Sequence, residues 1–498
     1  MIGMSIAGGG FELVCGDARI GQRRRLDDAT VTALTGFSAR YAALLDRDDD
    51  TSAELLVLGR DLYRFLDGDG RDLAALIDGA KRPLHFEIAT VSKRPADAER
   101  ALLRAPWELL ANDDGFLAAD VGLGFSPMRR LGRPEKPPAL DRYRLGVVFM
   151  AAAPRGAHEL DFEAEETAIM TAVGKTALDL LVEESGNPDL LAERIDELPA
   201  MQALHLNCHG NIDPQPVLLL EDEGGDALPV TAGKLIETLR AHRLRFLFLS
   251  ACLTAAAAPS TGDGPTQRSR RRGTLAQSLA EQMVDSGVPA VLGWDGSVGD
   301  AAAIAFAKNL YDGLAGRKTP PDALATARRT LLNAPQDDSK RRDWHLARLW
   351  LGPEGGGAIV GGRDRRSMLP ATHGEKEFLV EGRRLPVASH EMFVGRRREL
   401  QTALKALRDG EHAGVLLHGM GRLGKSSLAA RIANRRPDLK LAVVFERYDA
   451  LDILAALAEA LRNHRAASEA IEAAEKRVRD DASRLESELR WLLAGPCA

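Results

Sequence analysis

Short apolar runs of strand length alternate with amphipathic helical patterns through the middle of the chain, and this alternation restricts the fold more than any other feature. The predicted buried strands span 145–150, 177–182, 203–207, 245–249 and 289–292, and the predicted helices span 188–197, 232–242, 274–284, 300–314 and 322–332. Strands that alternate with helices form parallel pairs joined by helical crossovers. The pattern therefore predicts an α/β fold with a parallel-rich sheet covered by helices on both faces.

Changes in composition divide the 498 residues into several parts. The first part mixes acidic loops with amphipathic helices such as 52–66 and ends in a proline-rich stretch, and it shows no candidate chemistry. A long loop at 255–273 is predicted to be exposed, and 466–493 is predicted to form one charged amphipathic helix. The predicted parts are an α/β region at 1–140, the main α/β domain at 141–355, a linker at 356–390 and a second, smaller α/β region at 391–498.

Charge and cysteine content exclude several classes of protein. A formal net charge of −6 with only short basic runs gives no reason to expect nucleic-acid binding. The four cysteines form no C-x-x-C pair and argue against a disulfide framework. We find neither a signal peptide nor an apolar run long enough to span a membrane, so we expect a cytoplasmic protein with no membrane partner.

A histidine and a cysteine follow two of the predicted strands. His209-Gly210 ends the run LHLNCHG, and Cys252 ends the run LFLSAC. Since the carboxyl ends of neighbouring parallel strands share one edge of the sheet, both side chains are expected to face one crevice. An imidazole can take the proton of a thiol, and a glycine lets a backbone N–H approach an oxyanion. Each residue taken alone is more often structural, and the joint pattern favours a catalytic pair.

Two further residues near His209 suggest a metal site, which we reject. His205 and His209 lie on one strand and would be about 13 Å apart, too far to bind one ion. We assign His205 to a sheet face and Cys208 to packing.

A second motif lies near the end of the chain. The segment GMGRLGKS satisfies G-x-x-x-x-G-K-[ST], with a predicted strand at 415–418 before it and a predicted helix from 427 after it. Such a loop wraps phosphates with backbone N–H groups, while the lysine reaches the β- and γ-phosphates and the serine binds Mg²⁺. The predicted nucleotide-binding residues are Gly419, Gly421, Gly424, Lys425 and Ser426, with Ser426 as the Mg²⁺ ligand and ATP or ADP as the cofactor.

The first pair of motifs, together with GVPAVLGWDGSVGD, ALATARRTLLN and WHLARLWLG, resembles a CHAT domain over roughly residues 55–352. The resemblance implies a caspase-like cysteine peptidase fold, related to caspases, separase and gingipains. It implies peptide-bond cleavage by a Cys252 thiolate with His209 as acid/base, and an oxyanion hole formed by Gly210 and the Cys252 N–H. It also implies that the region before residue 140 is a degenerate half packed on the active sheet, and that proteolysis needs no cofactor.

The substrate pocket is less defined by the sequence. Relatives that cut after basic residues often place an acid two residues before the cysteine, and Ser250 stands there in this chain. Asp295, beside Trp294 in the loop after the next strand, is a candidate pocket residue, although a turn aspartate is at least as good an interpretation. The basic residues and Asp263 in the 255–273 loop suggest an autoprocessing site, for which a solvated insertion is the simpler reading.

The FVGRRREL and GMGRLGKSSLA segments resemble the start of a STAND-class P-loop NTPase over about residues 393–450. Arg422 departs from the pattern, because many relatives have glycine there. After the phosphate-binding loop, no apolar run leads into Asp-Asp or Asp-Glu, the pattern of the second NTPase motif. Glu446 is predicted to be a residue at the end of a strand. We therefore expect an incomplete NTPase domain that does not hydrolyse nucleotide.

The combined resemblance implies a caspase-like protease gated by an adjoining nucleotide switch, as in bacterial defence or programmed-death effectors. Its expected partners are a protein substrate, for example a gasdermin-like pore former, and further copies of the chain through the NTPase domain. The alternative is a non-catalytic signalling scaffold with a caspase-like interaction domain. A simple ATPase is excluded by the missing Asp-Asp or Asp-Glu strand.

Overall fold

The structure is a computed structural model in which the chain divides into two units, Met1–Pro370 and Ala371–Ala498. The predicted nucleophile Cys252, Glu446 and the whole 255–273 loop, Asp263 included, lie outside the described residues. The structure describes residues 2–47, 49–140, 145–157, 160–173, 178–196, 201–212, 216–222, 225–239, 244–251, 279–335, 339–361, 378–380, 383–385, 387–388, 393, 395–408, 412, 414–435, 441–444 and 450–495.

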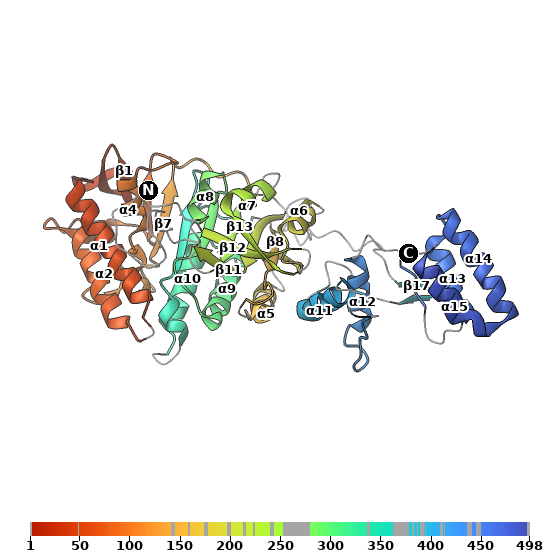
Figure 1. Cartoon of the computed structure of the whole chain (residues 1–498). Coiled ribbons are helices and arrows are strands. Elements are labelled where there is room, and N and C mark those ends of the chain that lie inside the picture. The colour runs from red at the N-terminus through yellow and green to blue at the C-terminus, as the bar shows by residue number, and fades with distance from the viewer. Residues whose placement is uncertain are drawn as a thin grey trace, which may run out of the picture. The chain divides into compact units, whose positions relative to one another are not determined.

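One large sheet organises the first unit (Figure 1). Its strand order is β3-β2-β1-β4-β7-β16-β15-β14-β10-β8-β9. These strands are β1 (Ile2–Ala7), β2 (Gly10–Cys15), β3 (Ala18–Arg25), β4 (His85–Thr90), β7 (Ser126–Leu131), β8 (Leu145–Ala151), β9 (Leu178–Glu183), β10 (Met201–Asn207), β14 (Phe246–Ser250), β15 (Ala290–Trp294) and β16 (Ala347–Leu351).

Helices surround this sheet. Those of the first part of the unit are α1 (Asp28–Leu45), α2 (Ser52–Asp67), α3 (Asp72–Gly79), α4 (Asp97–Arg104) and the 3₁₀ turns η1 (Trp107–Leu109) and η2 (Leu117–Ala119). Those of the second part are α5 (Phe162–Val173), α6 (Pro188–Asp196), α7 (Ala232–Leu239), α8 (Leu279–Asp285), α9 (Asp300–Ala315), α10 (Pro320–Leu332) and η3 (Ser339–Asp343). Two small sheets, β5 (Ala111–Asn112) with β6 (Gly115–Phe116) and β11 (His209–Ile212) with β12 (Pro216–Glu221) and β13 (Ala227–Thr231), complete the unit.

The central strands carry the core of the unit. Every residue of β8, β14, β15 and β16 is buried, which requires packing layers on both faces of the sheet. Strands buried on both faces are continuous apolar runs rather than alternating ones, and the runs identified in the sequence coincide with β8, β9, β10, β14 and β15 to within two residues. The predicted parallel-rich sheet with helices on both faces is confirmed.

The sheet is nevertheless mixed. β8, β9, β10, β14 and β15 run parallel to their neighbours, but β15 pairs with β16 in antiparallel fashion. β16 then pairs in parallel with β7, so β7, β4, β1, β2 and β3 continue the same sheet. The N-terminal region and the region of His209 therefore share one sheet and one hydrophobic core.

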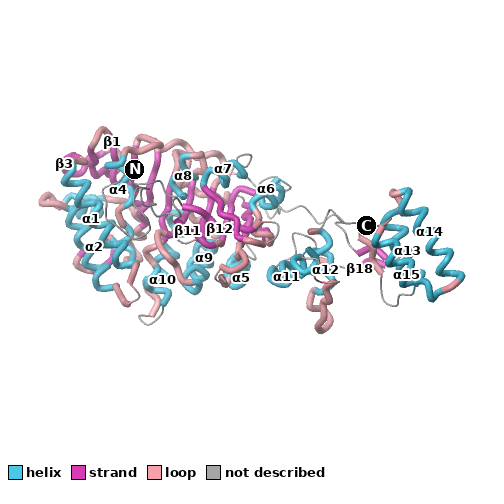
Figure 2. Tube along the Cα trace, in the orientation of Figure 1, coloured by secondary structure: helices cyan, strands magenta, loops and turns pink. Residues whose placement is uncertain are grey.

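The second unit contains two separate helical packings. The helices α11 (Arg397–Arg408) and α12 (Lys425–Asn434) pack through Leu400, Leu404 and Leu428. A short hairpin of β17 (Phe378–Val380) and β18 (Arg383–Leu385) belongs to the same unit. The other packing comprises α13 (Ala450–Leu461), α14 (Arg465–Asp480), the turn η5 (Ala482–Arg484) and α15 (Leu485–Ala494), which lie side by side in Figure 2.

Two sequence predictions for this unit are wrong. The predicted strand at 415–418 has no strand geometry, and Leu416 is 83% exposed, because the only hydrogen-bonded strands among the described residues of the unit are β17 and β18. The predicted single helix at 466–493 is interrupted at Asp481, whose backbone is extended and whose carboxylate accepts a hydrogen bond from the Ser483 N–H. That local bond competes with helix continuation.

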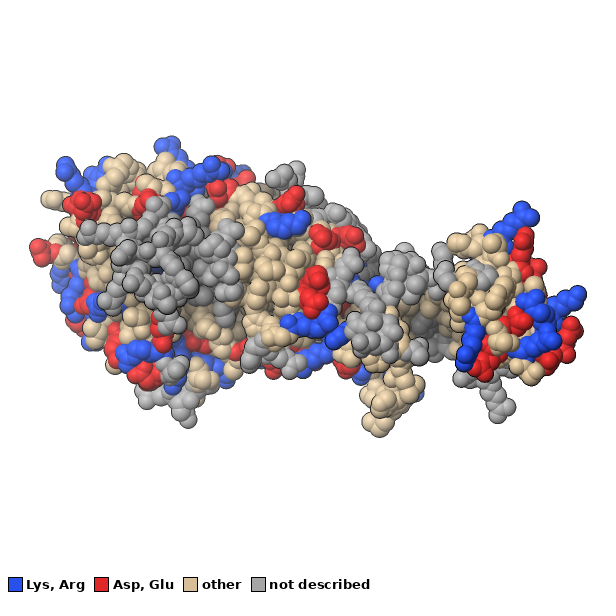
Figure 3. Space-filling model, in the orientation of Figure 1, with Lys and Arg blue, Asp and Glu red and all other residues tan. Residues whose placement is uncertain are grey.

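On the face of the molecule that Figure 3 shows, basic and acidic side chains are interspersed on both units. Over the described part of the chain, none of the helices is both long and apolar enough to cross a bilayer.

Candidate active site

Two parallel strands, β10 and β14, end next to each other at the edge of the sheet where His209 lies. Their last residues, Asn207 and Ser250, are paired in register, and the Cys208 N–H donates to the Ser250 carbonyl at 3.3 Å just beyond them. His209 and Cys252 each follow this pair by two residues. The last described residues before the two predicted catalytic positions, Cys208 and Ala251, therefore lie at the same edge of the sheet.

His209 and Gly210 are half-buried at the start of β11, where His209 pairs with Leu219 of β12. The β11–β12 hairpin thus begins two residues after β10 ends. Pairing between β11 and β12 fixes the backbone of His209. The neighbouring residues His205 and Cys208 are both buried, as the sequence predicted for a sheet-face residue and a packing residue.

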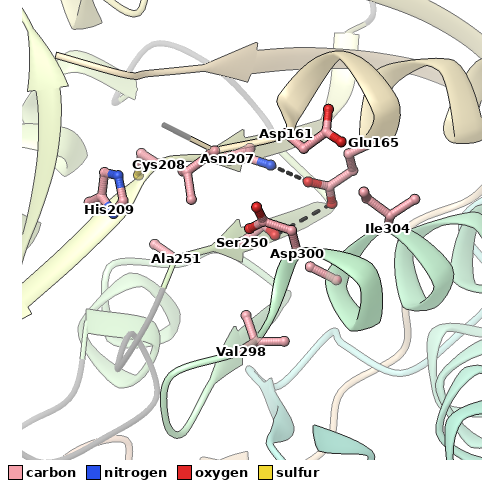
Figure 4. A pocket seen from close by; sticks show the side chains of 12 residues that line it. Asp161, Glu165, Asn207, Cys208, His209, Ser250, Ala251, Val298, Asp300 and Ile304 are labelled. Carbon is pink, nitrogen blue, oxygen red and sulfur yellow. Dashed lines mark hydrogen bonds between the residues drawn. The ribbon is translucent and has the colours of Figure 1, made fainter. Parts of the chain in front are cut away.

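A pocket opens beside these strand ends (Figure 4). Its walls come from three places: the start of α5, the ends of β10 and β14, and the start of α9. The lining residues are Leu160, Asp161, Glu165, Asn207, Cys208, His209, Ser250, Ala251, Val298, Asp300, Ala303 and Ile304. Three of them carry carboxylates, which favours a cationic group in the pocket over an anionic one.

The start of α5 is fixed by a local bond. The carboxylate of Asp161 accepts a hydrogen bond at 3.3 Å from the Ala164 N–H, one of the N–H groups that a helix leaves unpaired at its start. This arrangement points the first turn of α5, including Glu165, at the strand ends.

Glu165 connects the two strands. It is 1% exposed, and its carboxylate accepts a hydrogen bond from the side-chain amide of Asn207 and another at 3.5 Å from the Ser250 hydroxyl (Figure 4). His205 Nε2 lies 3.3 Å from the same carboxylate. Sequence reasoning missed Glu165 and Asn207, because an acid in the helix FEAEE and an amide next to Cys208 carry no distinguishing pattern.

The predicted pocket residues separate into two groups. Ser250 lines the pocket, whereas Trp294 is fully buried, with its indole N–H donating to the Ser250 hydroxyl at 3.4 Å. Asp295 does not line this pocket, and its carboxylate forms a buried ion pair with Arg348. Burial raises the pKa of Asp295 to about 6, and the Arg348 guanidinium opposes that rise.

The start of α9 is held by another carboxylate. Asp343 accepts a hydrogen bond at 2.9 Å from the Gly299 N–H, directly before Asp300. Burial raises the pKa of Asp343 to about 6, and the bond from Gly299 opposes this. The wall formed by Val298 and Asp300 is therefore tied to the segment that precedes β16.

The predicted phosphate loop lies in the second unit. Helix α12 starts at Lys425 after Gly424, whose φ is 76°, and the Lys425 ammonium donates to the carbonyls of Gly419 at 3.0 Å and Met420 at 2.6 Å. Arg422 has a φ of 64°, in the left-handed region where glycine is favoured.

Of the other residues predicted to bind nucleotide, Gly419 and Gly421 are exposed. Ser426 is half-buried in the first turn of α12. Within the described ranges, no group of three or more His, Cys, Asp or Glu side chains is arranged to hold a metal ion.

Solved structures provide several comparisons at low identity. Separase from Saccharomyces cerevisiae in its complex with securin is 14% identical over 65% of this chain and 22% of the separase chain, with a TM-score of 0.33. The Arg-specific cysteine proteinase gingipain R is 10% identical over 62% of this chain and 68% of its own, with a TM-score of 0.32. The complex of Porphyromonas gingivalis RgpB pro- and mature domains is 9% identical over 62% and 71%, with a TM-score of 0.36.

The chain thus spans less than a quarter of the separase chain. No curated protein matches it. The CHAT domain family model matches residues 95–355, more than half of the 498 residues, and the family assignment rests on this match. The resemblance to a CHAT domain, predicted from the motifs around His209 and Cys252, is confirmed as a family assignment. The chain belongs to the CHAT domain family.

Proposed function

We propose that this chain is a caspase-like cysteine endopeptidase that cleaves a partner protein, with Cys252 as nucleophile and His209 as acid/base. The register between β10 and β14 carries the proposal, because both residues follow the Asn207–Ser250 pair by two positions. Membership of the CHAT domain family supports it. A pocket lies beside His209, and its lining includes the ends of both strands.

The proposed reaction has two steps. The Cys252 thiolate attacks the scissile carbonyl carbon, and the negative charge on the carbonyl oxygen is met by the backbone N–H groups of Gly210 and Cys252. The imidazolium of His209 then gives its proton to the leaving amine. In the second step His209 takes a proton from water, and the hydroxide displaces the thiolate and releases the acid product.

We also propose that the second unit binds ATP or ADP with Mg²⁺ and gates the protease, in the manner of a STAND-class NTPase. The start of α12 supports this, since an exposed glycine-containing loop leads into the helix and the Lys425 ammonium bonds to carbonyls of that loop. Lys425 and the loop backbone would hold the phosphates, and Ser426 would hold the metal. Binding alone suffices for a switch, and we do not propose hydrolysis.

The biological proposal follows from the family resemblance. A gated protease of this type fits bacterial defence or regulated cell death in the cytoplasm, with a gasdermin-like pore former as one class of protein substrate. Self-assembly through the second unit would bring protease units together. The acidic lining of the pocket by Asp161 and Asp300 makes a substrate with a basic side chain the first to try.

The deciding experiment needs no substrate. We would measure iodoacetamide labelling of each cysteine by mass spectrometry from pH 5 to 9, in the wild-type chain and in His209→Ala. An ordinary thiol, with a pKa of about 8.5, is under about one per cent thiolate at pH 6. We expect fast labelling of Cys252 at pH 6 that is lost in His209→Ala, while the half-buried Cys15 labels slowly in both proteins.

Labelling of Cys252 at the rate of Cys15, unchanged by His209→Ala and by added ATP and Mg²⁺, would contradict the proposal. That outcome would favour the alternative, a non-catalytic scaffold that uses the CHAT domain as an interaction module.

A further inference from the structure

The carboxylate of Glu165 contacts both strands that lead into the proposed catalytic residues. One oxygen accepts from the Asn207 amide at the end of β10, and the other accepts from the Ser250 hydroxyl at the end of β14. His209 follows the first contact by two residues, and Cys252 follows the second by two residues. A single side chain on α5 therefore spans the two strand ends.

This carboxylate differs from the buried glutamates of the same unit that have an arginine partner. Glu108 and Glu281 each pair with an arginine, which offsets the cost of burying a charge. Among the residues that the structure describes, the hydrogen-bond partners of Glu165 are neutral, and the nearest ring nitrogen is His205 Nε2 at 3.3 Å. Burying a carboxylate without an arginine or lysine partner costs free energy of folding. Proteins keep costs of this kind mainly at functional sites.

The surroundings hold this carboxylate in place. The Trp294 indole N–H donates to the Ser250 hydroxyl at 3.4 Å, so that hydroxyl has a second partner besides Glu165. The Asn207 carbonyl accepts from the Ala152 N–H at 2.7 Å, which ties the same strand end to the residue after β8. Hydrogen bonds from an amide and a hydroxyl to one carboxylate depend on direction, so the bridging carboxylate restricts how the two strand ends lie relative to each other.

We propose that Glu165 is a positioning residue that sets the spacing and orientation of His209 and Cys252 by bridging Asn207 and Ser250. This inference rests on the proposed function, because it gives Glu165 a role only where those two residues form a catalytic pair. Glu165 takes no proton from substrate and donates none. Its effect reaches the reaction through the two strand ends.

The test compares Glu165→Ala, Glu165→Gln and the matched control Glu163→Ala, which changes a half-buried acid in the same helical turn. The readout is the rate of Cys252 labelling by iodoacetamide from pH 5 to 9, with Cys15 labelling and the thermal unfolding temperature recorded on the same full-length chains. We expect Glu165→Ala to slow labelling at pH 6 by roughly tenfold or more, because small misplacements of reacting groups are costly.

Glu165→Gln should stay within about threefold of wild type, since the amide still accepts from Asn207 and donates to Ser250. Glu163→Ala should label as wild type. Ser250→Ala should slow labelling in the wild-type background and add nothing to Glu165→Ala, since both changes remove the same contact.

The outcomes separate the two proposals. Wild-type Cys252 that labels no faster than Cys15 overturns the proposed function and this inference together. Fast wild-type labelling with an unchanged rate in Glu165→Ala overturns only the positioning role. Should Glu165→Ala fail to fold, the double variant Asn207→Ala/Ser250→Ala removes the same contacts from the strand side, and a wild-type labelling rate in it overturns the inference.

Discussion

Glu108 of η1 and Arg129 of β7 form a buried ion pair in which both guanidinium NH₂ groups donate to the carboxylate, the second at 2.8 Å. Neither side chain is more than 1% exposed. Arg328 of α10 and Arg348 of β16 approach the same carboxylate to 3.3 and 3.9 Å. Burial raises the pKa of Glu108, but these arginines outweigh it, Arg129 most of all, and lower the pKa to about 2.

We predict that Glu108→Gln is strongly destabilising, because it leaves several buried guanidinium groups without their common anion. Breaking one side of a buried pair costs about 3–5 kcal/mol in the free energy of unfolding. Urea unfolding followed by tryptophan fluorescence measures this loss of stability. The signal reports on the first unit, which contains Trp107, Trp294, Trp344 and Trp350. The matched change Glu54→Gln, at an exposed pair with Arg47, should stay within about 0.5 kcal/mol. Equal effects of the two substitutions would refute this role for Glu108.

A second prediction concerns His345, whose Nδ1 lies 2.9 Å from the Tyr41 hydroxyl. Burial lowers the pKa of His345 to about 3, from about 6.5 in the unfolded chain. Between these values the unfolded state binds the extra proton, so the free energy of unfolding falls as the pH decreases from 6.5 towards 3. The slope is at most about 1.4 kcal/mol for each pH unit.

The variant His345→Asn tests this, because asparagine can still accept from Tyr41 and does not titrate. We expect unfolding experiments between pH 6.5 and 5 to show a shallower loss of stability than in wild type. A control, His464→Asn in the second unit, should leave the slope unchanged. A wild-type slope in His345→Asn would assign the acid sensitivity to other groups.

A third prediction uses two glycines in neighbouring helices. A Cβ added at Gly59 of α2 would lie 2.0 Å from the Leu109 carbonyl oxygen, whereas a Cβ at Gly36 of α1 meets nothing within 4 Å. Gly59→Ala must therefore push α2 away from η1 and should cost about 1–3 kcal/mol or more. Gly36→Ala should be neutral or stabilising by up to about 1 kcal/mol, as for other helix-interior glycines. Thermal unfolding of both variants checks the contrast, and a stable Gly59→Ala would show that the close approach is not required.

A fourth prediction tests the phosphate loop. If the proposed nucleotide site is correct, Lys425→Ala should weaken binding of ATP with Mg²⁺ by at least about tenfold, because the ammonium that contacts phosphate is lost. Isothermal titration calorimetry measures the affinity, and Lys405→Ala on α11 is the matched control. Binding of wild-type strength in Lys425→Ala, or no binding by the wild-type chain, would count against the site.

The strands of the central sheet could be located from the sequence because burial on both faces demands continuous apolar residues. β14, with the sequence FLFLS, is such a run. β16 was not recognised as a strand, since it contains Arg348, whose charge is accommodated by Asp295, Glu108 and the Arg104 carbonyl from elsewhere in the chain. The strand predicted at 415–418 was apolar enough, but a strand also needs a hydrogen-bonded neighbour, which local sequence does not reveal.

The candidate site was predictable only in part for a related reason. His209 and Gly210 stand out because an imidazole and a glycine follow a buried strand. Glu165 does not, because a glutamate in an acidic helical turn looks the same whether it faces water or a pocket. Only the hydrogen bonds of its side chain to two strand ends distinguish it from Glu163 of the same turn.

The position of β16 has a consequence for how the chain is made. Its partner β7 is synthesised much earlier than β16. The two strands join where Trp350 pairs with Arg129. Beside this pair, Arg130 donates to the carbonyl of Gly352, which lies 222 residues later in the chain. Until β16 is in place, β7 and β15 each present an unpaired edge. The sheet of the first unit is therefore closed by a contact of long sequence separation, and contacts of this kind are associated with slow folding.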